Sequence, residues 1–299
     1  MAKRFYYGGQ AVIEGVMMRG RKAAVIAVRR PNGEVVIEPQ PLPAISTGKA
    51  RRIPLIRGVV VLIESMVLGI KALLHSANLS MEEEEEKEKI SGGVAWGAMI
   101  GSVALVVALF ILAPLFLANL EGGYIQSSIV FHLIEGFIRL GIFIAYLKSM
   151  TLSPSIRRVF AYHGAEHKVV NAYEAGIPLE IEAVKKYSTA HVRCGTSFLF
   201  IVLMIAIIVF ALIGRPSLGV MVLSRVVLIP AIAALGYEAT YFGARHSDSR
   251  LVKAFLAPGL WLQGLTTSEP DDSQLEVALS ALKRMVEIDG VGEAAQASS

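Results

Sequence analysis

The chain has 299 residues, of which 54% are hydrophobic and only 18% charged, and its mean hydropathy is +0.56. These values lie outside the range of an ordinary soluble domain and predict an integral membrane protein. The 29 basic residues barely exceed the 25 acidic ones, and no basic run is interleaved with aromatic residues, which argues against nucleic-acid binding. The single cysteine, Cys194, excludes an intrachain disulfide.

The N-terminal part of the chain, residues 1–93, is predicted to be a cytoplasmic region with a small β element. Residues 23–39 contain two apolar segments on either side of Asn32-Gly33, and this dipeptide favours the positive φ angles of a tight hairpin turn. The acidic run at 82–89 is expected to be a solvated linker or helix surface.

The middle of the chain, residues 94–237, is predicted to form four transmembrane helices. They cover residues 94–117, about 126–147, 197–213 and 218–237. The first has 24 residues without a charge, enough to cross a hydrocarbon core of about 30 Å at 1.5 Å per residue. The second contains Glu135 and Arg139 and the fourth contains Arg225, and such charges either neutralise each other or line a polar cavity.

The distribution of Lys and Arg predicts the orientation of these helices. There are 14 before residue 94, none in 118–125, seven in 148–196, one at Arg215 and five after residue 237. Because short cytoplasmic loops hold the excess of cations, both termini and the loop 148–196 are expected in the cytoplasm.

A fifth apolar stretch, residues 58–79, is long enough to cross but carries Glu64, Lys71 and His75. If it crossed, every later loop would change sides. We therefore predict that it is interfacial, re-entrant or packed against the helices from the cytoplasmic side.

Residues 238–299 are predicted to form a cytoplasmic C-terminal region. Ser273 and Glu276 have the spacing of a capping box for a helix over about 274–288. The composition of residues 290–299 predicts a disordered tail.

The strongest chemical signal is the sequence Tyr-His-Gly-Ala-Glu-His-Lys at residues 162–168, inside the loop 148–196. His163 and His167 project from one face of a helix, and Glu166 lies on nearly the same side. Two imidazoles on adjacent turns are able to hold one divalent metal, while the carboxylate takes a proton from bound water, as in the H-x-x-E-H order of inverted zincins. The alternative is an ordinary helix surface.

Further candidate ligands lie at the same predicted membrane face. Segments 191–197 and 236–248 enter or leave the third and fourth helices on the cytoplasmic side, so their polar side chains are expected near the two histidines. For the third metal ligand the order of preference is Glu238, His191, and then Cys194 or His246.

Four segments together resemble the bacterial YqhQ-like family of membrane proteins. They are residues 8–20 (GGQAVIEGVMMRG), 162–168 (YHGAEHK), 191–197 (HVRCGTS) and 258–267 (PGLWLQGLTT). The resemblance covers nearly the whole chain. The family is of unknown function and is described as a predicted metal-dependent enzyme, so the resemblance implies a metal centre without naming a substrate. The Gly-rich residues 8–20 lack the pattern of a phosphate loop and are predicted to form a turn under the site.

The predicted function is metal-dependent hydrolysis at the cytoplasmic membrane interface, with zinc as the preferred metal. Glu166 would be the catalytic base, and Arg193 or Arg245 would stabilise an oxyanion. Two alternatives stay open: a transporter or channel whose pathway is lined by the intramembrane charges, and a membrane scaffold with a structural metal. The expected partners are the lipid bilayer and a substrate that the sequence does not identify, and a homo-oligomer is compatible with the sequence.

Overall fold

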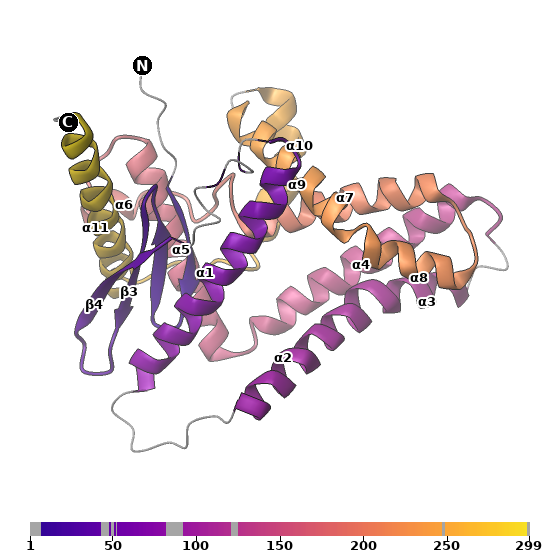
Figure 1. The fold of residues 1–299 in the computed structure, drawn as a ribbon, viewed down its shortest axis with the longest axis horizontal. Helices are drawn as coiled ribbons and strands as arrows, with labels where there is room; N and C mark the ends of the chain where they lie inside the picture. Colours follow the sequence, from indigo (N-terminus) through magenta and orange to yellow (C-terminus); the bar gives the residue numbers. More distant parts are fainter. Residues whose placement is uncertain are drawn as a thin grey trace.

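The computed structural model describes residues 7–42, 48, 51, 53–81, 92–120, 125–246 and 249–297. The described chain is mainly helical, with one small antiparallel sheet (Figure 1). The acidic run at 82–89 lies outside the described residues.

The four strands are β1 (Gly8–Val12), β2 (Gly15–Arg19), β3 (Ala23–Arg29) and β4 (Val35–Pro41). The helices are α1 (Ile56–Met81), α2 (Gly92–Val107), the π-helix η3 (Ala108–Leu112), α3 (Ala113–Leu120), α4 (Ser128–Met150), α5 (Pro154–Glu174), α6 (Ile181–Val184), α7 (Gly195–Ile213), α8 (Leu218–Val227), α9 (Ile229–Arg245), α10 (Arg250–Gln263) and α11 (Asp272–Ala297).

The sheet is a meander in the order β1-β2-β3-β4. The predicted hairpin over 23–39 is confirmed as β3 and β4, with Arg29 opposite Val35 and Gly33 at φ 87° in the turn. The hairpin of β1 and β2 was not predicted. Its glycine-rich strands have low β propensity, and only the pairing of Val12 with Gly15 across the tight turn shows why the chain is extended there.

Helices cover both faces of the sheet. Alternate strand residues point to opposite faces, so the apolar strands β2 and β3 serve two cores. One face packs on α5 and α11, in a core that includes Val16, Met18, Val25, Ala27, Tyr162, Ala165, Leu275 and Leu282. The other packs on α1, in a core that includes Met17, Ala24, Ile26, Leu68 and Ala72. This sheet layer therefore joins residues from the N-terminal, central and C-terminal parts of the sequence.

Helix α1 contains the apolar stretch 58–79 and lies on the sheet, obliquely to the long axis of the other apolar helices (Figure 1). It also packs on α9. Its opposite side exposes large apolar residues, among them Ile63, Met66, Ile70 and Leu74. Packing against the sheet was not among the three predicted alternatives; it accounts for one face of α1 and leaves the other face apolar and exposed.

The remaining apolar helices form a bundle that extends away from the sheet layer (Figure 1). The predicted spans at 94–117, 126–147 and 197–213 are confirmed as helices. Among the described residues, four helices are each long and apolar enough to cross a membrane, namely α1, the helix over 100–120, α4 and α7. The span predicted over 218–237 is broken into α8 and α9, which meet at a bend of 48° and are long and apolar enough only as a pair. Pro230 has no N–H to continue the helix at that point.

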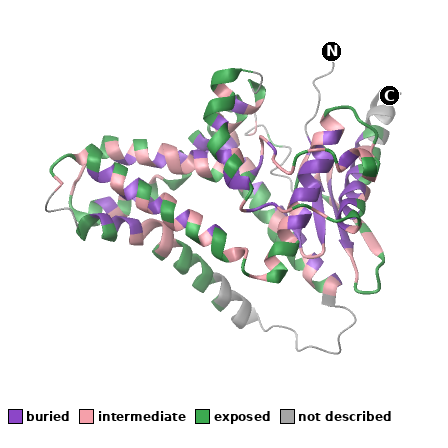
Figure 2. Ribbon diagram, turned by 180° about the vertical axis from the view of Figure 1, so that it is seen from behind, coloured by how far each residue is buried: buried purple, intermediate pink, exposed green. Residues whose placement is uncertain are grey.

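The bundle exposes apolar side chains and buries charged ones. Leu212, Leu120 and Phe137 are 83%, 76% and 70% exposed, whereas Glu135 is 1% exposed. Figure 2 shows the contrast with the sheet layer, where the buried residues are concentrated. An apolar outer surface over a charged interior is the reverse of a water-soluble bundle and is compatible with a lipid environment.

The buried charges form one network around Glu135. Its carboxylate accepts hydrogen bonds from Arg139 Nη2 at 2.6 Å and from Arg225 Nε at 2.9 Å, and His132 Nδ1 lies 3.0 Å away. Arg139 Nε donates to the carbonyl of Phe110 in η3 at 3.0 Å. Pro114 lies four residues after Phe110 and has no N–H, so the usual α-helical donor to this carbonyl is missing.

The N-terminal cap of the C-terminal helix differs from its prediction. Asp271 caps α11, since its Oδ1 accepts from the backbone N–H of Gln274 at 2.9 Å, and Ser273 only bonds to Asp271. The helix extends to Ala297.

We predict that Glu135→Gln destabilises the bundle by about 3–5 kcal/mol, because it leaves two buried guanidinium groups without a counter-charge. Glu276→Gln removes an exposed partner of Arg29 and should cost less than about 1 kcal/mol. The measurement is denaturant unfolding of the purified protein in detergent. Equal losses for the two variants would mean that Glu135 is not the counter-ion of the bundle.

Candidate functional site

Helix α5 carries the H-x-x-E-H residues, and its ends are defined locally. The Ser153 side chain accepts from the N–H of Ile156, and Pro154 occupies the first turn, where its missing N–H costs nothing. Gly176, at φ 73°, follows the last turn in the left-handed conformation that ends many helices. The predicted helical placement of His163 and His167 is thereby confirmed.

The other residues of the 162–168 motif hold α5 in the sheet layer. The Tyr162 hydroxyl donates to Glu14 in the β1–β2 turn at 3.3 Å, and burial raises the pKa of Tyr162, so it stays a donor. Gly164 lets the backbone of Ser268 approach, because a Cβ there would lie 2.1 Å from the Ser268 carbonyl oxygen. Lys168 is buried and donates to the carbonyl of Lys185 at 2.7 Å. The motif is thus partly a packing motif.

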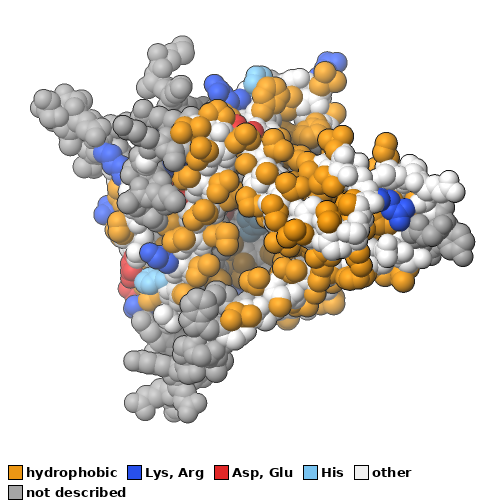
Figure 3. Space-filling view, turned by 45° about the vertical axis from the view of Figure 1, so that its right-hand side comes forward, with side chains coloured by type: hydrophobic (Ala, Val, Ile, Leu, Met, Phe, Trp, Pro, Cys, Tyr) orange, Lys and Arg blue, Asp and Glu red, His pale blue; other side chains and the backbone are white. Residues whose placement is uncertain are grey.

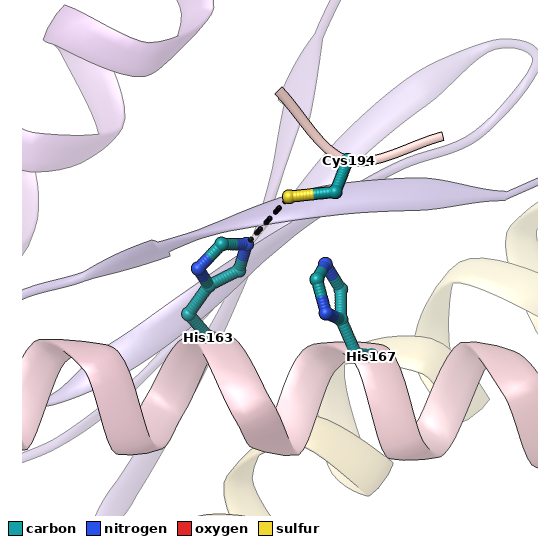
Figure 4. Close-up of side chains that lie close together, drawn as sticks. All are labelled: His163, His167 and Cys194. Carbon is teal, nitrogen blue, oxygen red and sulfur yellow. Dashed lines mark hydrogen bonds between the residues drawn. The ribbon is translucent and has the colours of Figure 1, made fainter. Parts of the chain in front are cut away.

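Both imidazoles are oriented by backbone carbonyl groups. His163 Nδ1 lies 2.8 Å from the Thr266 oxygen, and His167 Nδ1 lies 2.5 Å from the Thr189 oxygen. A carbonyl oxygen only accepts, so each Nδ1 carries the proton and each Nε2 has a free lone pair. The two Nε2 atoms point to the same side of α5 (Figure 4).

Cys194 completes this group. Its Sγ lies 3.4 Å from His163 Nε2, and one ligand atom from each of His163, His167 and Cys194 lies within 4.8 Å of the others (Figure 4). Cys194 caps α7, where its sulfur accepts from the N–H of Thr196 at 3.4 Å. Among the described residues this is the group of His, Cys, Asp and Glu side chains arranged to hold a metal ion.

Gln263 fixes the loop that carries Cys194. Its side chain is fully buried; Oε1 accepts from the N–H of His191, and Nε2 donates to the His191 carbonyl and to Ser197, at 2.6–2.8 Å. The Thr266 hydroxyl lies 2.9 Å from that of Thr196. The segment 258–267 therefore supplies both the carbonyl that orients His163 and the amide that orients the cysteine loop. Sequence reasoning gave it no part in the site.

Glu166 lies in the same site. Its carboxylate Oε2 is 3.5 Å from His167 Nε2, and the side chain is buried. Gly9 of β1 makes room for it, since a Cβ on Gly9 would be 3.2 Å from Glu166 Cγ. The Gly-rich N-terminal segment thus forms a hairpin beside the cluster. The structure brings together His163, His167, Glu166 and Cys194.

Arg193 and His191 lie next to this group without joining it. The guanidinium of Arg193 forms an ion pair with Glu174, and His191 Nε2 lies 3.6 Å from the same carboxylate. Burial by itself would raise the pKa of Glu174, but these two contacts lower it below the usual range. The His191 ring stands 5.7 Å from the His167 ring, centroid to centroid. Arg193 lines the cavity that also contains His163.

The structure does not bring the other candidates to the cluster. Glu238, the preferred third ligand, accepts from Arg57 Nε at 2.7 Å and from the N–H of Leu55 at 3.0 Å, and so ties α9 to α1. His246 is exposed and its ring stacks on Phe242. Arg245 stacks on Tyr241. The number of residues between α5 and Glu238 does not determine how close they lie in the fold. The Glu238 carboxylate points to α1 instead of the cluster.

Comparison with known proteins identifies the family. Residues 53–288, which include every residue of the cluster, match the family of proteins of unknown function DUF1385. The chain belongs to this family. It is 35% identical to the "Uncharacterized protein YqhQ" of Bacillus subtilis (strain 168), over 98% of this chain and 96% of that protein. No solved structure matches. The resemblance to YqhQ-like proteins is confirmed, and neither description states an activity.

We predict that Gly164→Ala destabilises the protein by about 1–3 kcal/mol, because the new methyl group meets the Ser268 carbonyl and displaces the segment that orients His163. Gly141→Ala is the matched control, since a Cβ there meets nothing within 4 Å. It should be neutral or stabilising by up to about 1 kcal/mol. Thermal unfolding in detergent measures both, and a neutral Gly164→Ala would contradict this account of the motif.

Proposed function

We propose that this chain is a polytopic protein of the bacterial cytoplasmic membrane whose sheet layer, with the His163–His167–Cys194 cluster, lies in the cytoplasm. The apolar outer surface of the bundle and its buried ionic network support the membrane placement. The cation distribution supports the orientation, because the seven Lys and Arg of residues 148–196 belong to the part of the chain that carries α5.

Single-cysteine labelling of intact cells tests this topology. Ser217→Cys lies in the exposed turn between α7 and α8, and we expect a membrane-impermeant maleimide to label it from outside. Glu180→Cys lies in an exposed loop after α5, and it should be labelled only after lysis. The native Cys194 is buried, so the unmodified chain gives the background. The opposite pattern would reverse the orientation.

We further propose that the cluster binds a divalent metal, with zinc preferred. The observation that carries this proposal is that two imidazoles and one thiol converge. The Nδ1 atom of each imidazole is bound to a backbone carbonyl, which leaves its Nε2 atom available as a ligand. Ligand atoms held tetrahedrally about 2.0–2.3 Å from zinc are roughly 3.3–3.8 Å apart. The 3.4 Å from His163 Nε2 to Cys194 Sγ lies in this range, and one ligand atom of each of the three residues lies within 4.8 Å of the others. Imidazole and thiolate suit zinc better than magnesium or calcium.

The proposed reaction is hydrolysis. A metal held by these three residues would have a fourth position for water, and it would make that water acidic enough to attack an ester, amide or phosphoester at neutral pH. Glu166, 3.5 Å from His167, would take the proton of the water and pass it to the leaving group. Arg193, on the wall of the adjoining cavity, would stabilise negative charge on the substrate.

The buried charges of the bundle support a structural role better than a transport pathway. Glu135 holds both Arg139 and Arg225, and the Phe210 ring stacks on their guanidinium groups at 5.6 and 4.6 Å. A pathway would need these groups to exchange partners, at the cost of leaving a buried charge unpaired. The enzyme proposal is therefore preferred to the transporter.

Metal analysis of the purified protein tests the cluster. His163→Ala, His167→Ala and Cys194→Ser should each lose stoichiometric metal, and the thiolate-to-metal charge-transfer band of the cobalt form should vanish in Cys194→Ser. His246→Ala, which removes an exposed histidine outside the cluster, should keep both. Metal retained in all three cluster variants would refute the site.

A separate variant divides the roles within the cluster. Glu166→Gln keeps the size of the side chain but cannot accept a proton, so it should retain metal and lower turnover about 10²–10⁴-fold. The readouts are metal content, hydrolysis of a panel of model esters and phosphoesters, and complementation of a deletion strain. If Glu166→Gln loses metal as the histidine variants do, Glu166 is a ligand and the mechanism lacks its base.

A further inference from the structure

The cluster stands at the wall of a cavity of about 620 Å³ between β1, α1, α5, α7 and α9. His163 is part of its lining, together with apolar side chains such as Leu62, Phe198 and Leu199. Figure 3 shows that hydrophobic side chains cover this side of the molecule and surround a hollow near its centre. A substrate that reaches His163 by this route must therefore be largely apolar.

A second cavity, of about 440 Å³, lies next to the first, in the bundle. Leu199 lines both, and the second follows α7 from Leu199 to Phe210 between η3, α4 and α9. Arg139 and Arg225 line its deep end, but their guanidinium groups are held by Glu135, so the walls are apolar. At 1.5 Å per residue this length of α7 is about 17 Å, roughly half of a hydrocarbon core about 30 Å thick. The cavity thus has the length of an acyl chain in one leaflet.

A third cavity, of about 230 Å³, adjoins the first at Gly9, Gln10 and Arg193, and it is polar and cationic. Three arginines line it, Arg19, Arg51 and Arg193, against one lining carboxylate, Glu64. Glu64 is buried between Arg19 at 2.9 Å and Arg51 at 3.2 Å.

Arg19 and Arg51 lie close together at this third cavity, on either side of Glu64, and Arg193 pairs with Glu174 from outside the cavity. Burial lowers the pKa of Arg51, and the neighbouring charge of Arg19 adds to the effect. An anion placed here would offset this repulsion, and guanidinium groups bind phosphate oxygens with paired hydrogen bonds.

We propose that the three cavities are one binding crevice for a lipid with a phosphate headgroup, the headgroup at Arg19, Arg51 and Arg193 and the chain along α7. The proposal rests on the proposed function for the reaction, since it makes such a lipid the substrate of the His163–His167–Cys194 site. Binding of the lipid needs no metal. In the proposed topology, α7 begins at the cytoplasmic surface, so headgroup and chain match the orientation of a lipid in the inner leaflet.

The test is equilibrium binding of hexadecyl phosphate to the full-length protein in nanodiscs of neutral phosphatidylcholine. Leu199→Trp fills the junction of the two apolar cavities and should weaken binding at least about tenfold. Leu212→Trp makes the same change on the same helix, at a fully outward position, and should bind as the unmodified chain does. Equal weakening in both would overturn the crevice, because it would show adsorption to the outer surface of the bundle.

The headgroup is tested with a second pair of variants. Arg51→Gln leaves Glu64 paired with Arg19 and should weaken the binding of hexadecyl phosphate at least about tenfold. Arg284→Gln, which changes an exposed arginine of α11, should leave that binding unchanged. Hexadecyltrimethylammonium should bind at least about tenfold more weakly than hexadecyl phosphate. Equal binding of this cation overturns headgroup recognition. If inorganic phosphate binds as tightly as hexadecyl phosphate, the claim that the ligand is a lipid is refuted, and the site binds free phosphate.

The same titration on His167→Ala separates the two proposals. Hexadecyl phosphate should bind this variant with unchanged affinity, because His167 belongs to the cluster but, unlike His163, does not line the cavity. If the unmodified protein lacks stoichiometric metal but binds the lipid, the enzyme proposal is refuted and the crevice proposal stands. If it binds metal but not the lipid, the crevice proposal is refuted and the metal-site proposal stands.

Discussion

The burial of α5 between the sheet and the C-terminal segments is the constraint on which the site depends. Its Tyr162, Ala165 and Val169 side lies in the core shared with β2, β3 and α11, so the helix cannot rotate about its axis. The opposite side then presents His163 and His167 in one fixed direction. A surface helix with the same sequence would carry the same residues without a fixed partner for either ring.

Backbone carbonyl groups orient the two imidazole rings. Thr189 and Thr266 belong to loops that are themselves held by Gln263 and by the contact of Ser268 with α5. Each loop fixes one imidazole through Nδ1 and so leaves Nε2 for another partner. Cys194 follows Thr189 on the same loop, at the start of α7. The arrangement therefore depends on three separated stretches of the chain meeting at one point: α5, the loop 189–194 and the segment 263–268.

The bundle and the sheet layer meet at this same point. Helix α7 starts at Cys194 and continues into the bundle, while α9 packs on both α7 and α1. The pair of Arg57 with Glu238 holds α1 to α9 at the rim of the cavity beside His163. The apolar cavities and the cluster are consequently parts of one region, bounded by a polar layer on one side and apolar helices on the other. Such a boundary suits an amphipathic ligand, whose two ends need different surroundings.

How far the sequence decides this structure differs between local and long-range features. Uninterrupted apolar runs predict the helices at 94–117, 126–147 and 197–213, and Asn32-Gly33 predicts the β3–β4 turn, because periodicity, length and turn chemistry are properties of neighbouring residues. The spacing of His163, Glu166 and His167 likewise predicts one helical face. The β1–β2 hairpin is different, since its glycines are explained only by the close approach of β3, where a Cβ on Gly15 would lie 2.0 Å from the Ala27 oxygen.

The sequence by itself determined the apolar helices, their cationic flanks and two members of the cluster. Only the tertiary structure decided the third, Cys194 in place of Glu238. Both residues sit at the end of an apolar helix, and no local pattern distinguishes them. The choice depends on long-range contacts: Gln263 holds the Cys194 loop over α5, and Arg57 draws Glu238 to α1. Contacts between segments that are many residues apart produce no local pattern in a single sequence. Which of the two residues joins the cluster is therefore seen only in the folded chain.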